Sequence, residues 1–278
     1  ASGFDLIVYD VRKEAAISLV EDGALWARSP REVAEQCEIL CTCLPGPKEM
    51  EEVTLGRNGI IEGFRRDSIY IDHTTNSPTM VRKVCNALNN QGISMLDAPV
   101  SGGMEGARTR KLTILVGGDA DIVEKSRPVL EAIGNNVIHV GDIGNGCICK
   151  LAHNSASFTV RQAIIECLTL GVKAGVDPTT LITVFQQSAL GNAFDLQQRL
   201  PDTLFKGDFE PRFSLKLSNK DMSLATDLAH LNNVPMPLTE ITAQEMKTAI
   251  SKGWENMDGS IAMTLREERA NVQIRIDE

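Results

Sequence analysis

A lysine and an asparagine four residues apart are the first candidates for chemistry in this 278-residue chain. Lys150 and Asn154 follow three closely spaced glycines, Gly141, Gly144 and Gly146. Residues four apart project from the same face of a helix, so both side chains would reach one ligand. Partial burial near a helix N-terminus lowers the pKa of a lysine, which suits proton transfer near neutral pH. Taken alone, the pair is equally compatible with a solvated lysine beside an asparagine that bonds locally.

A second candidate is a turn that follows a predicted strand, at Asp97-Ala-Pro-Val-Ser101-Gly102-Gly103. Two adjacent glycines allow backbone N–H groups to converge on an anion, and the Ser101 hydroxyl adds a donor. The carboxyl ends of strands are the places where α/β folds bind ligands. A tight turn would explain the two glycines equally well.

Three further segments have residue types that suit a cofactor. Leu44-Pro45 and the loop from Asp72 to Pro78, which includes Thr75, each follow a predicted strand. Their backbone and hydroxyl groups suit contact with a nucleotide, but turning the chain and capping the next helix are alternatives. The third segment runs from Lys220 to Asp227. Considered alone, Lys220 is most simply explained as part of an ion pair on the surface of a helix.

Asp10 ends the predicted strand Phe4–Tyr9. In dinucleotide-binding folds an acid at the end of the second strand bonds the adenine ribose, about 20 residues after a Gly-x-Gly-x-x-Gly turn. Only nine residues precede Asp10, and the sequence has no Gly-x-Gly-x-x-Gly. Asp10 is therefore either an ordinary strand-end acid or the ribose acid of a chain that lacks its first strand and glycine turn.

These candidates must be positioned by an alternating series of strands and helices in the first half of the chain. Short apolar runs separated by amphipathic stretches predict βαβ units around a largely parallel sheet. The predicted strands are Phe4–Tyr9, Ile39–Leu44, Ser68–Ile71, Ile93–Leu96, Leu112–Val116 and Val137–Val140. The predicted helices between them include Arg12–Glu21, one that starts at Ser29-Pro30, Ser77–Asn89 and Asp119–Ile133.

The second half of the chain shows only helical patterns. Apolar residues recur at helical spacing through Gly146–Lys173, which predicts one long helix. Further helices are predicted at Asp177–Gln187, Leu215–Leu231 and Pro237–Ser251. The domain boundaries that follow are 1–143 for an α/β domain and 144–278 for an all-helical domain.

Composition narrows the class of protein. The formal net charge is −9, which argues against a nucleic-acid partner. No apolar run is long enough for a transmembrane helix, and the N-terminus lacks a signal-peptide pattern, so we expect no membrane association. Seven cysteines in largely apolar surroundings are typical of reduced thiols, which favours a cytoplasmic location. The cysteine spacings, with four scattered histidines, do not form a metal-ligand pattern, so no metal site is expected.

These segments, in this order, resemble the β-hydroxyacid dehydrogenases, the 3-hydroxyisobutyrate dehydrogenase-like family, over nearly the whole chain. The family's Asp-x-Pro-Val-Ser-Gly-Gly-x-x-Gly-Ala signature is matched by Asp97 to Ala107. Its Gly-x-x-Gly-x-Gly-x-x-x-Lys-x-x-x-Asn signature is matched in full by Gly141 to Asn154. Its Lys-Asp-Leu-Gly-x-Ala-x-Asp signature is similar to the segment that starts at Lys220, with Met222 and Ser223 as departures.

The resemblance implies a Rossmann-type α/β domain, a long interdomain helix and an all-α domain through which the chain would form a homodimer or homotetramer. It implies hydride transfer between a nicotinamide cofactor and the hydroxyl carbon of a small carboxylate-bearing β-hydroxy acid. The implied catalytic residues are Lys150 and Asn154, and the implied substrate-binding residues are Ser101, Gly102, Gly103 and Asn154. The implied cofactor-binding residues are Asp10, Arg12, Leu44, Pro45, Thr75 and Lys220, with NAD the expected cofactor and NADP possible.

The resemblance leaves alternatives open. Lys150-Leu-Ala-His153-Asn154 is also similar to the Lys-x-x-His-Asn of 6-phosphogluconate dehydrogenases, which would make a sugar acid the substrate. A non-catalytic binding or scaffold protein could keep the same fold. Arg110 stands where the family usually has a glycine, which weakens any carry-over of substrate identity. By the resemblance, the segment that the chain lacks is the first strand with its glycine turn.

Overall fold

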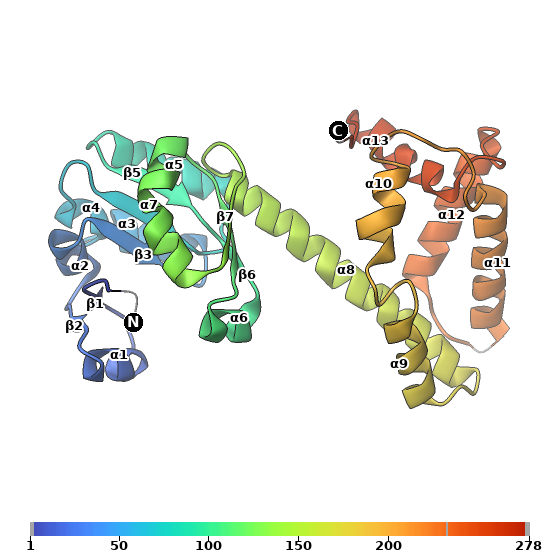
Figure 1. The fold of residues 1–278 in the computed structure, drawn as a ribbon, viewed down its shortest axis with the longest axis horizontal. Helices are drawn as coiled ribbons and strands as arrows, with labels where there is room; N and C mark the ends of the chain where they lie inside the picture. The colour runs from blue at the N-terminus through green and yellow to red at the C-terminus, as the bar shows by residue number, and fades with distance from the viewer. Residues whose placement is uncertain (1–2, 232, 276–278) are drawn as a thin grey trace. The chain divides into compact units, whose positions relative to one another are not determined.

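The computed structural model describes residues 3–231 and 233–275 and divides into two compact units, residues 1–156 and 157–278 (Figure 1). Within these ranges, the backbone alone is described at nine positions: 161, 196, 220, 221, 224, 225, 227, 228 and 231. The first unit is an α/β domain, and the second is helical.

The strands of the first unit form three small sheets. β1 (Ile7–Val8) and β2 (Leu25–Trp26) pair in parallel, and β3 (Ile39–Thr42), β4 (Ile69–Asp72) and β5 (Ser94–Asp97) form a parallel sheet. In the third sheet, β7 (Thr113–Val116) pairs in parallel with β8 (Asn136–His139) and antiparallel with β6 (Val100–Ser101). An isolated bridge between Asp97 and Gly117 connects the second sheet to the third.

Local signals explain where several helices of this unit begin. Ser29 precedes α2 (Pro30–Gln36), and its hydroxyl accepts a hydrogen bond from the Glu32 N–H at 3.2 Å. Asp119 caps α7 (Ala120–Ile133) by accepting from the N–H groups of Asp121 and Ile122. The remaining helices are η1 (Lys13–Ala16), α1 (Ile17–Glu21), α3 (Pro47–Leu55), α4 (Ile60–Gly63), α5 (Pro78–Asn89) and α6 (Gly103–Thr109).

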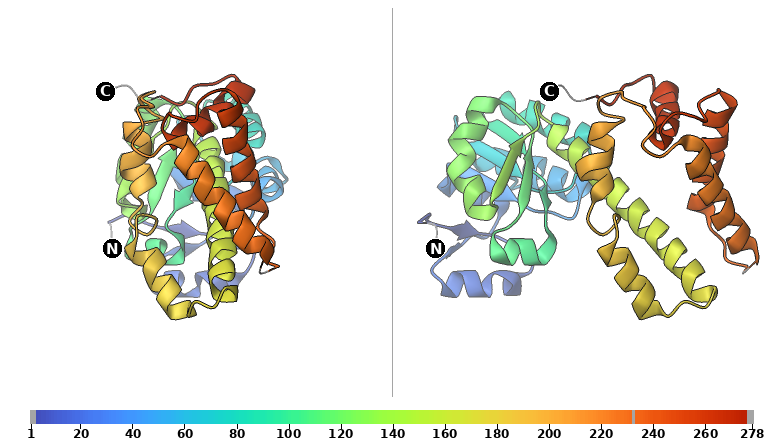
Figure 2. Two further views of the ribbon diagram at one scale, coloured as in Figure 1. Left: turned by 90° about the vertical axis from the view of Figure 1, so that its right-hand side faces the viewer. Right: turned by 45° about the vertical axis from the view of Figure 1, so that its right-hand side comes forward.

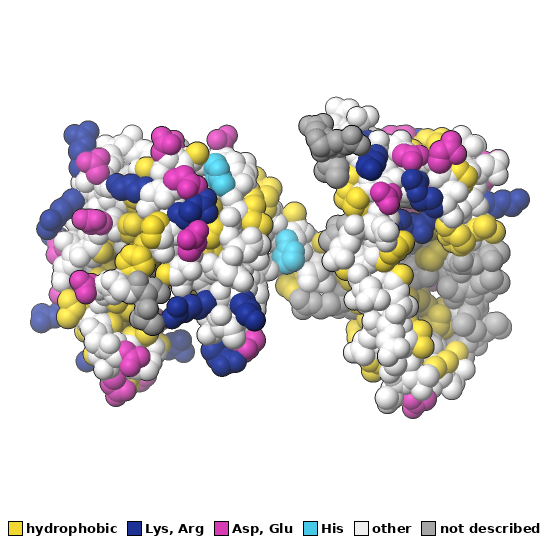
Figure 3. Space-filling view, viewed as in Figure 1, with side chains coloured by type: hydrophobic (Ala, Val, Ile, Leu, Met, Phe, Trp, Pro, Cys, Tyr) yellow, Lys and Arg dark blue, Asp and Glu magenta, His cyan; other side chains and the backbone are white. Residues whose placement is uncertain are grey.

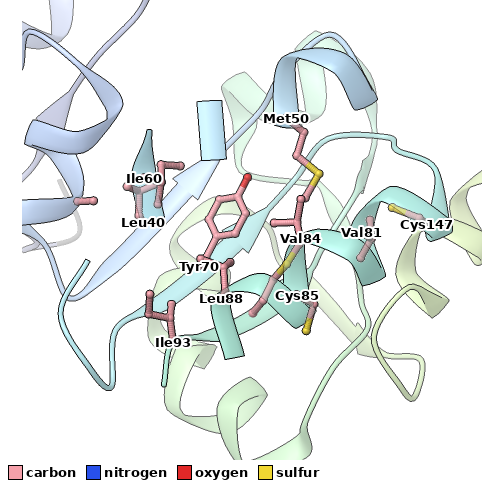
Figure 4. Packing of buried hydrophobic residues seen from close by; sticks show 12 residues of the cluster. Leu40, Met50, Ile60, Tyr70, Val81, Val84, Cys85, Leu88, Ile93 and Cys147 are labelled. Carbon is pink, nitrogen blue, oxygen red and sulfur yellow. The ribbon is translucent and has the colours of Figure 1, made fainter. Parts of the chain in front are cut away.

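The core of the first unit lies on both faces of β4. Ile69, Tyr70 and Ile71 are each at most 1% exposed, as expected for a strand covered by helices on both sides. Tyr70 packs near Val84 and Leu88 of α5 (Figure 4). Burial of these apolar side chains holds the strands in place, so their carboxyl ends are fixed positions on which a site can be built.

α8 (Asn145–Lys173) begins in the first unit and continues into the second. The second unit also holds α9 (Pro178–Gln187), η2 (Asp195–Arg199), α10 (Leu200–Asp202), α11 (Leu215–Leu231), α12 (Pro237–Ser251), η3 (Gly259–Met263) and α13 (Thr264–Ala270). α11 and α12 lie side by side (Figure 2). Within the described ranges, no helix is both long enough and apolar enough to cross a membrane.

The structure confirms the predicted fold class of a Rossmann-type domain followed by a helical one. It differs from the predicted elements at the N-terminus, where the strand predicted over Phe4–Tyr9 is reduced to Ile7–Val8 and a short partner, β2, was missed. Phe4 and Leu6 are 55% and 50% exposed, so the apolar run there is not buried against a neighbouring strand. The two units divide inside α8 and not at its start, because the first turns of α8 are bonded to the first unit.

Candidate functional site

The carboxyl ends of three parallel strands bring the candidate residues of the first unit to one edge of the sheet. Thr42 of β3 is paired with Asp72 of β4, and Asp72 is paired with Asp97 of β5. The loop at Leu44, the loop at Thr74 and the turn at Ser101 each begin just beyond one of these residues. The segments that the sequence analysis singled out separately are therefore neighbours, at the edge where α/β folds bind ligands.

Lys150 lies in the second turn of α8 and is only 8% exposed. Desolvation by burial lowers its pKa from the ordinary lysine value. Asn154 follows one turn later on the same helix and is partly buried. A buried amine beside an amide can exchange a proton with a ligand and orient it at the same time.

The turn after β5 meets α8 through a contact that was not predicted. Ser101 lies on β6, and its Oγ is 3.3 Å from Nε2 of His153, the residue next to Asn154. This hydrogen bond brings the predicted substrate turn to the helix that carries Lys150. His153 entered the sequence analysis only as part of the Lys-x-x-His-Asn likeness, and its position three residues after Lys150 places both on nearby parts of one helix face.

The two glycines of the turn have backbone conformations that other residues rarely adopt. Gly102 has φ = +134° and Gly103 has φ = +63°, and both are exposed. α6 starts at Gly103, so unpaired N–H groups of its first turn are available to an anion. Arg110, which ends α6, has φ = +57°, a left-handed conformation that a glycine would adopt at lower cost.

Asp97 is fully buried. It was not among the predicted site residues, although it is the first residue of the predicted substrate signature, Asp97 to Ala107. Its Oδ1 accepts a hydrogen bond from the Gly144 N–H and its Oδ2 accepts one from the Cys147 N–H, both at 2.7 Å. Burial raises the pKa of Asp97, and the two backbone donors oppose that shift. The carboxylate therefore ties the end of β5 to the start of α8.

The predicted cofactor residues of the β3 and β4 loops are held together by one hydrogen bond. The Leu44 N–H donates to Oγ1 of Thr74 at 2.9 Å, while Pro45 and Thr75 remain exposed. Behind them, the buried Asp72 accepts from the Thr42 hydroxyl at 2.8 Å and from the Thr74 N–H at 3.1 Å. The two loops are thus joined by a hydrogen bond and present the exposed Thr75 hydroxyl at the edge of the sheet.

His73 lies at the same edge and was not predicted. Its Nδ1 donates to the carbonyl oxygen of Ala98 at 2.7 Å, and its buried Nε2 has no hydrogen-bond partner among the described residues. Burial lowers its pKa, so the imidazole is neutral at physiological pH.

Asp10 and Arg12 do not take part in this cluster among the described contacts. Asp10 follows β1, which pairs with β2 among the described strands, and its Oδ1 accepts from the Arg12 N–H at 2.7 Å. The side chains of Asp10 and Arg12 are 40% and 79% exposed, so both are open to a ligand. Lys220 lies on α11, and its side chain is outside the described residues. Within the described part of the chain, no three His, Cys, Asp or Glu side chains gather as metal ligands would.

Comparison with known proteins agrees with this arrangement. Residues 1–141 match the family described as the NAD binding domain of 6-phosphogluconate dehydrogenase. Residues 144–265 match the family described as NAD-binding of NADP-dependent 3-hydroxyisobutyrate dehydrogenase. Together the two matches span both units of the structure.

Relatives of known activity cover most of the chain. A 3-hydroxyisobutyrate dehydrogenase of Pseudomonas aeruginosa is 36% identical over 242 residues, 85% of this chain and 81% of that protein. A 2-(hydroxymethyl)glutarate dehydrogenase of Eubacterium barkeri is 31% identical over 269 residues, 92% of this chain and 89% of that protein. The solved structure of a Mycobacterium tuberculosis 3-hydroxyisobutyrate dehydrogenase with L-serine is similar with a TM-score of 0.64 and 28% identity, covering 95% of this chain and 92% of that one. The chain therefore belongs to the β-hydroxyacid dehydrogenases, enzymes that use a nicotinamide cofactor to oxidise or reduce hydroxy acids.

Proposed function

We propose that this dehydrogenase acts on a small β-hydroxy acid of the 3-hydroxyisobutyrate kind, with Lys150 as its general acid–base group. The observation that carries the proposal is the buried amine of Lys150, on a helix bonded to the turn at Ser101. The names of the relatives support the substrate class, because 3-hydroxyisobutyrate and 2-(hydroxymethyl)glutarate both carry a hydroxyl on the carbon β to a carboxylate.

The residues at the sheet edge fit the nicotinamide cofactor that the family uses. The hydrogen-bonded pair of loops at Leu44-Pro45 and Thr75 offers backbone and hydroxyl groups, and the exposed carboxylate of Asp10 suits a ribose. Arg12 and Lys220 complete the set that we propose to hold the cofactor. The cofactor held there would supply the acceptor or donor of the hydride.

Lys150 moves the proton of the substrate hydroxyl. Hydride leaves the carbon only as the hydroxyl proton departs, so a base must contact that oxygen. A neutral amine at Nζ accepts the proton during oxidation, and the ammonium form donates it during reduction. Burial favours the neutral form, which makes the amine available at a lower pH than an exposed lysine would allow.

Ser101, Gly102 and Gly103 bind the substrate carboxylate in this proposal. The Ser101 hydroxyl and the N–H groups at the start of α6 are donors that suit an anion. Asn154, one turn after Lys150, orients the hydroxyl-bearing end of the substrate. The two ends of a small hydroxy acid would then be held by separate elements, which fixes the reacting carbon.

A panel of substrates tests the proposed class. The protein is assayed with 3-hydroxyisobutyrate, L-serine and 6-phosphogluconate, and with 2-methyl-1,3-propanediol, in which the carboxylate is replaced by a neutral hydroxymethyl group. We expect the highest kcat/KM with a small β-hydroxy acid. A higher value with 6-phosphogluconate would support the sugar-acid alternative, and equal activity on the diol would contradict carboxylate recognition.

Ser101→Ala removes one donor to the carboxylate. We expect KM for the hydroxy acid to rise by about tenfold, the effect of a charge-assisted hydrogen bond, while cofactor affinity is retained. Ser94→Ala, at the opposite end of β5, is the matched control and should leave both constants unchanged. An unchanged KM in Ser101→Ala would remove Ser101 from the substrate site.

We propose NAD as the preferred cofactor, because the Asp10 carboxylate would repel the 2′-phosphate of NADP. Asp10→Ser removes that repulsion and leaves Arg12 beside the site, so the ratio of kcat/KM for NAD to that for NADP should fall by at least about tenfold. Asp22→Ser, at the end of α1, is the control and should leave the ratio unchanged. A preference for NADP in the unmodified protein would reject the assignment.

We propose that the helical unit associates with a second copy of the chain. Large apolar side chains are exposed on two helices of this unit. The exposed fractions are 43–58% for Val160, Ile165 and Val172 of α8, and 44% and 55% for Ile182 and Val184 of α9. Hydrophobic side chains are visible on the surface of this unit (Figure 3). Apolar exposure of this kind is typical of an interaction surface. Light scattering of the purified protein measures the oligomeric state directly.

A further inference from the structure

We propose that Asp97 is a positioning residue that sets Lys150 relative to the substrate turn. The inference rests on the proposed role of Lys150. Asp97 does not contact the reacting atoms in this proposal; it acts through the two backbone N–H groups that it binds at the start of α8.

The carboxylate of Asp97 uses both of its oxygens on the first turn of the helix. Oδ1 accepts from Gly144 and Oδ2 from Cys147, each at 2.7 Å, and the side chain is 0% exposed. A carboxylate at a helix N-terminus is stabilised by the helix dipole and by N–H groups that lack partners within the helix. Bonds of this length to a charged acceptor are among the stronger hydrogen bonds in proteins, and water does not compete with a fully buried group.

Two glycines of the Gly-x-x-Gly-x-Gly pattern, Gly144 and Gly146, lie directly against Asp97. Gly144 donates one of the hydrogen bonds and has φ = +92°, which favours glycine. A Cβ on Gly146 would lie 2.9 Å from Oδ2 of Asp97 and 2.6 Å from its backbone oxygen. A Cβ on Gly117 would lie 2.4 Å from Oδ1. The glycines therefore make room for a carboxylate of the protein itself.

The backbone of Asp97 is as firmly held as its side chain. Its N–H donates to the Gly117 carbonyl oxygen at 3.0 Å, and its own carbonyl accepts from the Gly117 N–H at 2.8 Å. It also ends β5 in register with Asp72 of β4. Ser101 follows four residues later, on a strand that is paired with β7. One residue thus joins the sheet, the substrate turn and the lysine helix.

Lys150 is three residues after Cys147, which places the two about one helical turn apart. Because Asp97 holds the Cys147 N–H, a loss of its carboxylate frees the turn directly below Lys150. The Cys147 side chain is itself buried beside Val81 of α5 and would keep the helix attached to the core (Figure 4). We therefore expect a small displacement of Lys150 and not detachment of the helix.

Asp97→Asn and Asp97→Ser test this role in the full chain, with Asp119→Asn as the matched control. Asparagine can accept only one of the two hydrogen bonds and turns its NH₂ group toward the other donor, while serine keeps one acceptor. Asp119 caps α7 in the same unit, so this control makes the same acid-to-amide change at the start of a helix that does not carry Lys150. Circular dichroism first establishes that each variant is folded, and cofactor affinity is measured by fluorescence titration.

We expect kcat for the hydroxy acid to fall by about 10- to 100-fold in both Asp97 variants, because small misplacements of a catalytic group have effects of this size. Cofactor affinity and substrate KM should change by less than threefold. Hydrogen exchange should accelerate in the peptide that contains residues 144–150. The control should keep its kcat even where it loses thermal stability.

The outcomes separate the inference from the proposed function. Suppose that the unmodified protein turns over the hydroxy acid and that Lys150→Ala abolishes this activity. A retained kcat in folded Asp97→Asn would then overturn the positioning role and leave the proposed function intact. A chain that does not fold with either Asp97 replacement would also overturn it, since Asp97 would then be required for folding as such. Absence of turnover in the unmodified protein on every hydroxy acid would reject the proposed function, and the hydrogen-exchange result would still report whether Asp97 holds α8.

Discussion

Lys150→Ala is expected to reduce kcat by about 10²- to 10⁴-fold, the usual contribution of a positioned proton-transfer group. The variant should remain folded, since α8 stays attached through the Asp97 bonds and the buried Cys147 side chain. Cofactor affinity should change little, because Lys150 is not one of the residues proposed to hold the cofactor. Turnover and cofactor binding are measured on the same preparation, which separates a loss of catalysis from a loss of binding.

Lys150→Arg distinguishes proton transfer from charge attraction. Arginine keeps the positive charge but does not release its proton near neutral pH. We expect it to be nearly as inactive as the alanine variant, with a substrate KM closer to that of the unmodified protein. Near-normal turnover with arginine would leave Lys150 only an electrostatic role. Lys173→Ala, at the other end of the same helix, is the control and should be fully active.

The pH dependence follows from the direction in which burial shifts Lys150. Its pKa is lowered, so the neutral amine needed for oxidation is present at a lower pH than for an exposed lysine. Oxidation of the hydroxy acid should therefore rise with pH through a midpoint below the ordinary lysine pKa of 10.5, and reduction of the product should fall through the corresponding midpoint. In Lys150→Ala, the residual oxidation should no longer rise with pH in this range, and the residual reduction should no longer fall.

Gly146→Ala is expected to reduce the free energy of unfolding of the first unit by about 3 kcal/mol. The added Cβ would lie 2.5 Å from the Leu115 carbonyl oxygen and 2.6 Å from that of Asp97, so backbone and not a flexible side chain would have to move. Alanine is preferred to glycine within a helix by only about 0.5–1 kcal/mol, which does not compensate for this overlap. Denaturant unfolding followed by circular dichroism measures the change.

Gly46→Ala is the matched control for this prediction. Its φ of 176° is extended backbone, and its added Cβ would meet only the Glu49 carboxylate at 3.7 Å, an ordinary contact. We expect a change within about 1 kcal/mol. Equal effects of the two substitutions would show that close packing around Asp97 is not what requires glycine at position 146.

The family match bears on one of the alternatives that the sequence analysis left open, the non-catalytic scaffold. Two dehydrogenase families span residues 1–141 and 144–265, and relatives named as dehydrogenases cover most of the chain, which supports an enzyme over a non-catalytic scaffold. The specific hydroxy acid depends on contacts beyond these shared features, so the substrate panel and the Ser101 variant address it directly.

Features that depend on near neighbours in the chain were predictable from the sequence alone. The helical spacing in Gly146–Lys173 predicted α8 almost to the residue and placed Lys150 and Asn154 on one face. The Ser29 cap and the bounds of α11 and α12 were likewise predicted correctly, because periodicity and capping are local properties. The order of strands and helices was sufficient for the fold class.

The contacts that join these pieces were not predictable from the sequence and are seen in the folded chain. Asp97 binds N–H groups 47 and 50 residues away, and Ser101 meets a histidine 52 residues away. Such contacts depend on strand register and on the residue at which a helix begins, and neither is encoded in a local pattern. The sequence alone gives Gly144 and Gly146, the glycines nearest before Lys150, no role beyond their place in a signature. Their role as the surroundings of a buried carboxylate became evident only when β5 and the start of α8 were seen together, because the bonding groups are far apart in the chain and meet only in the folded core.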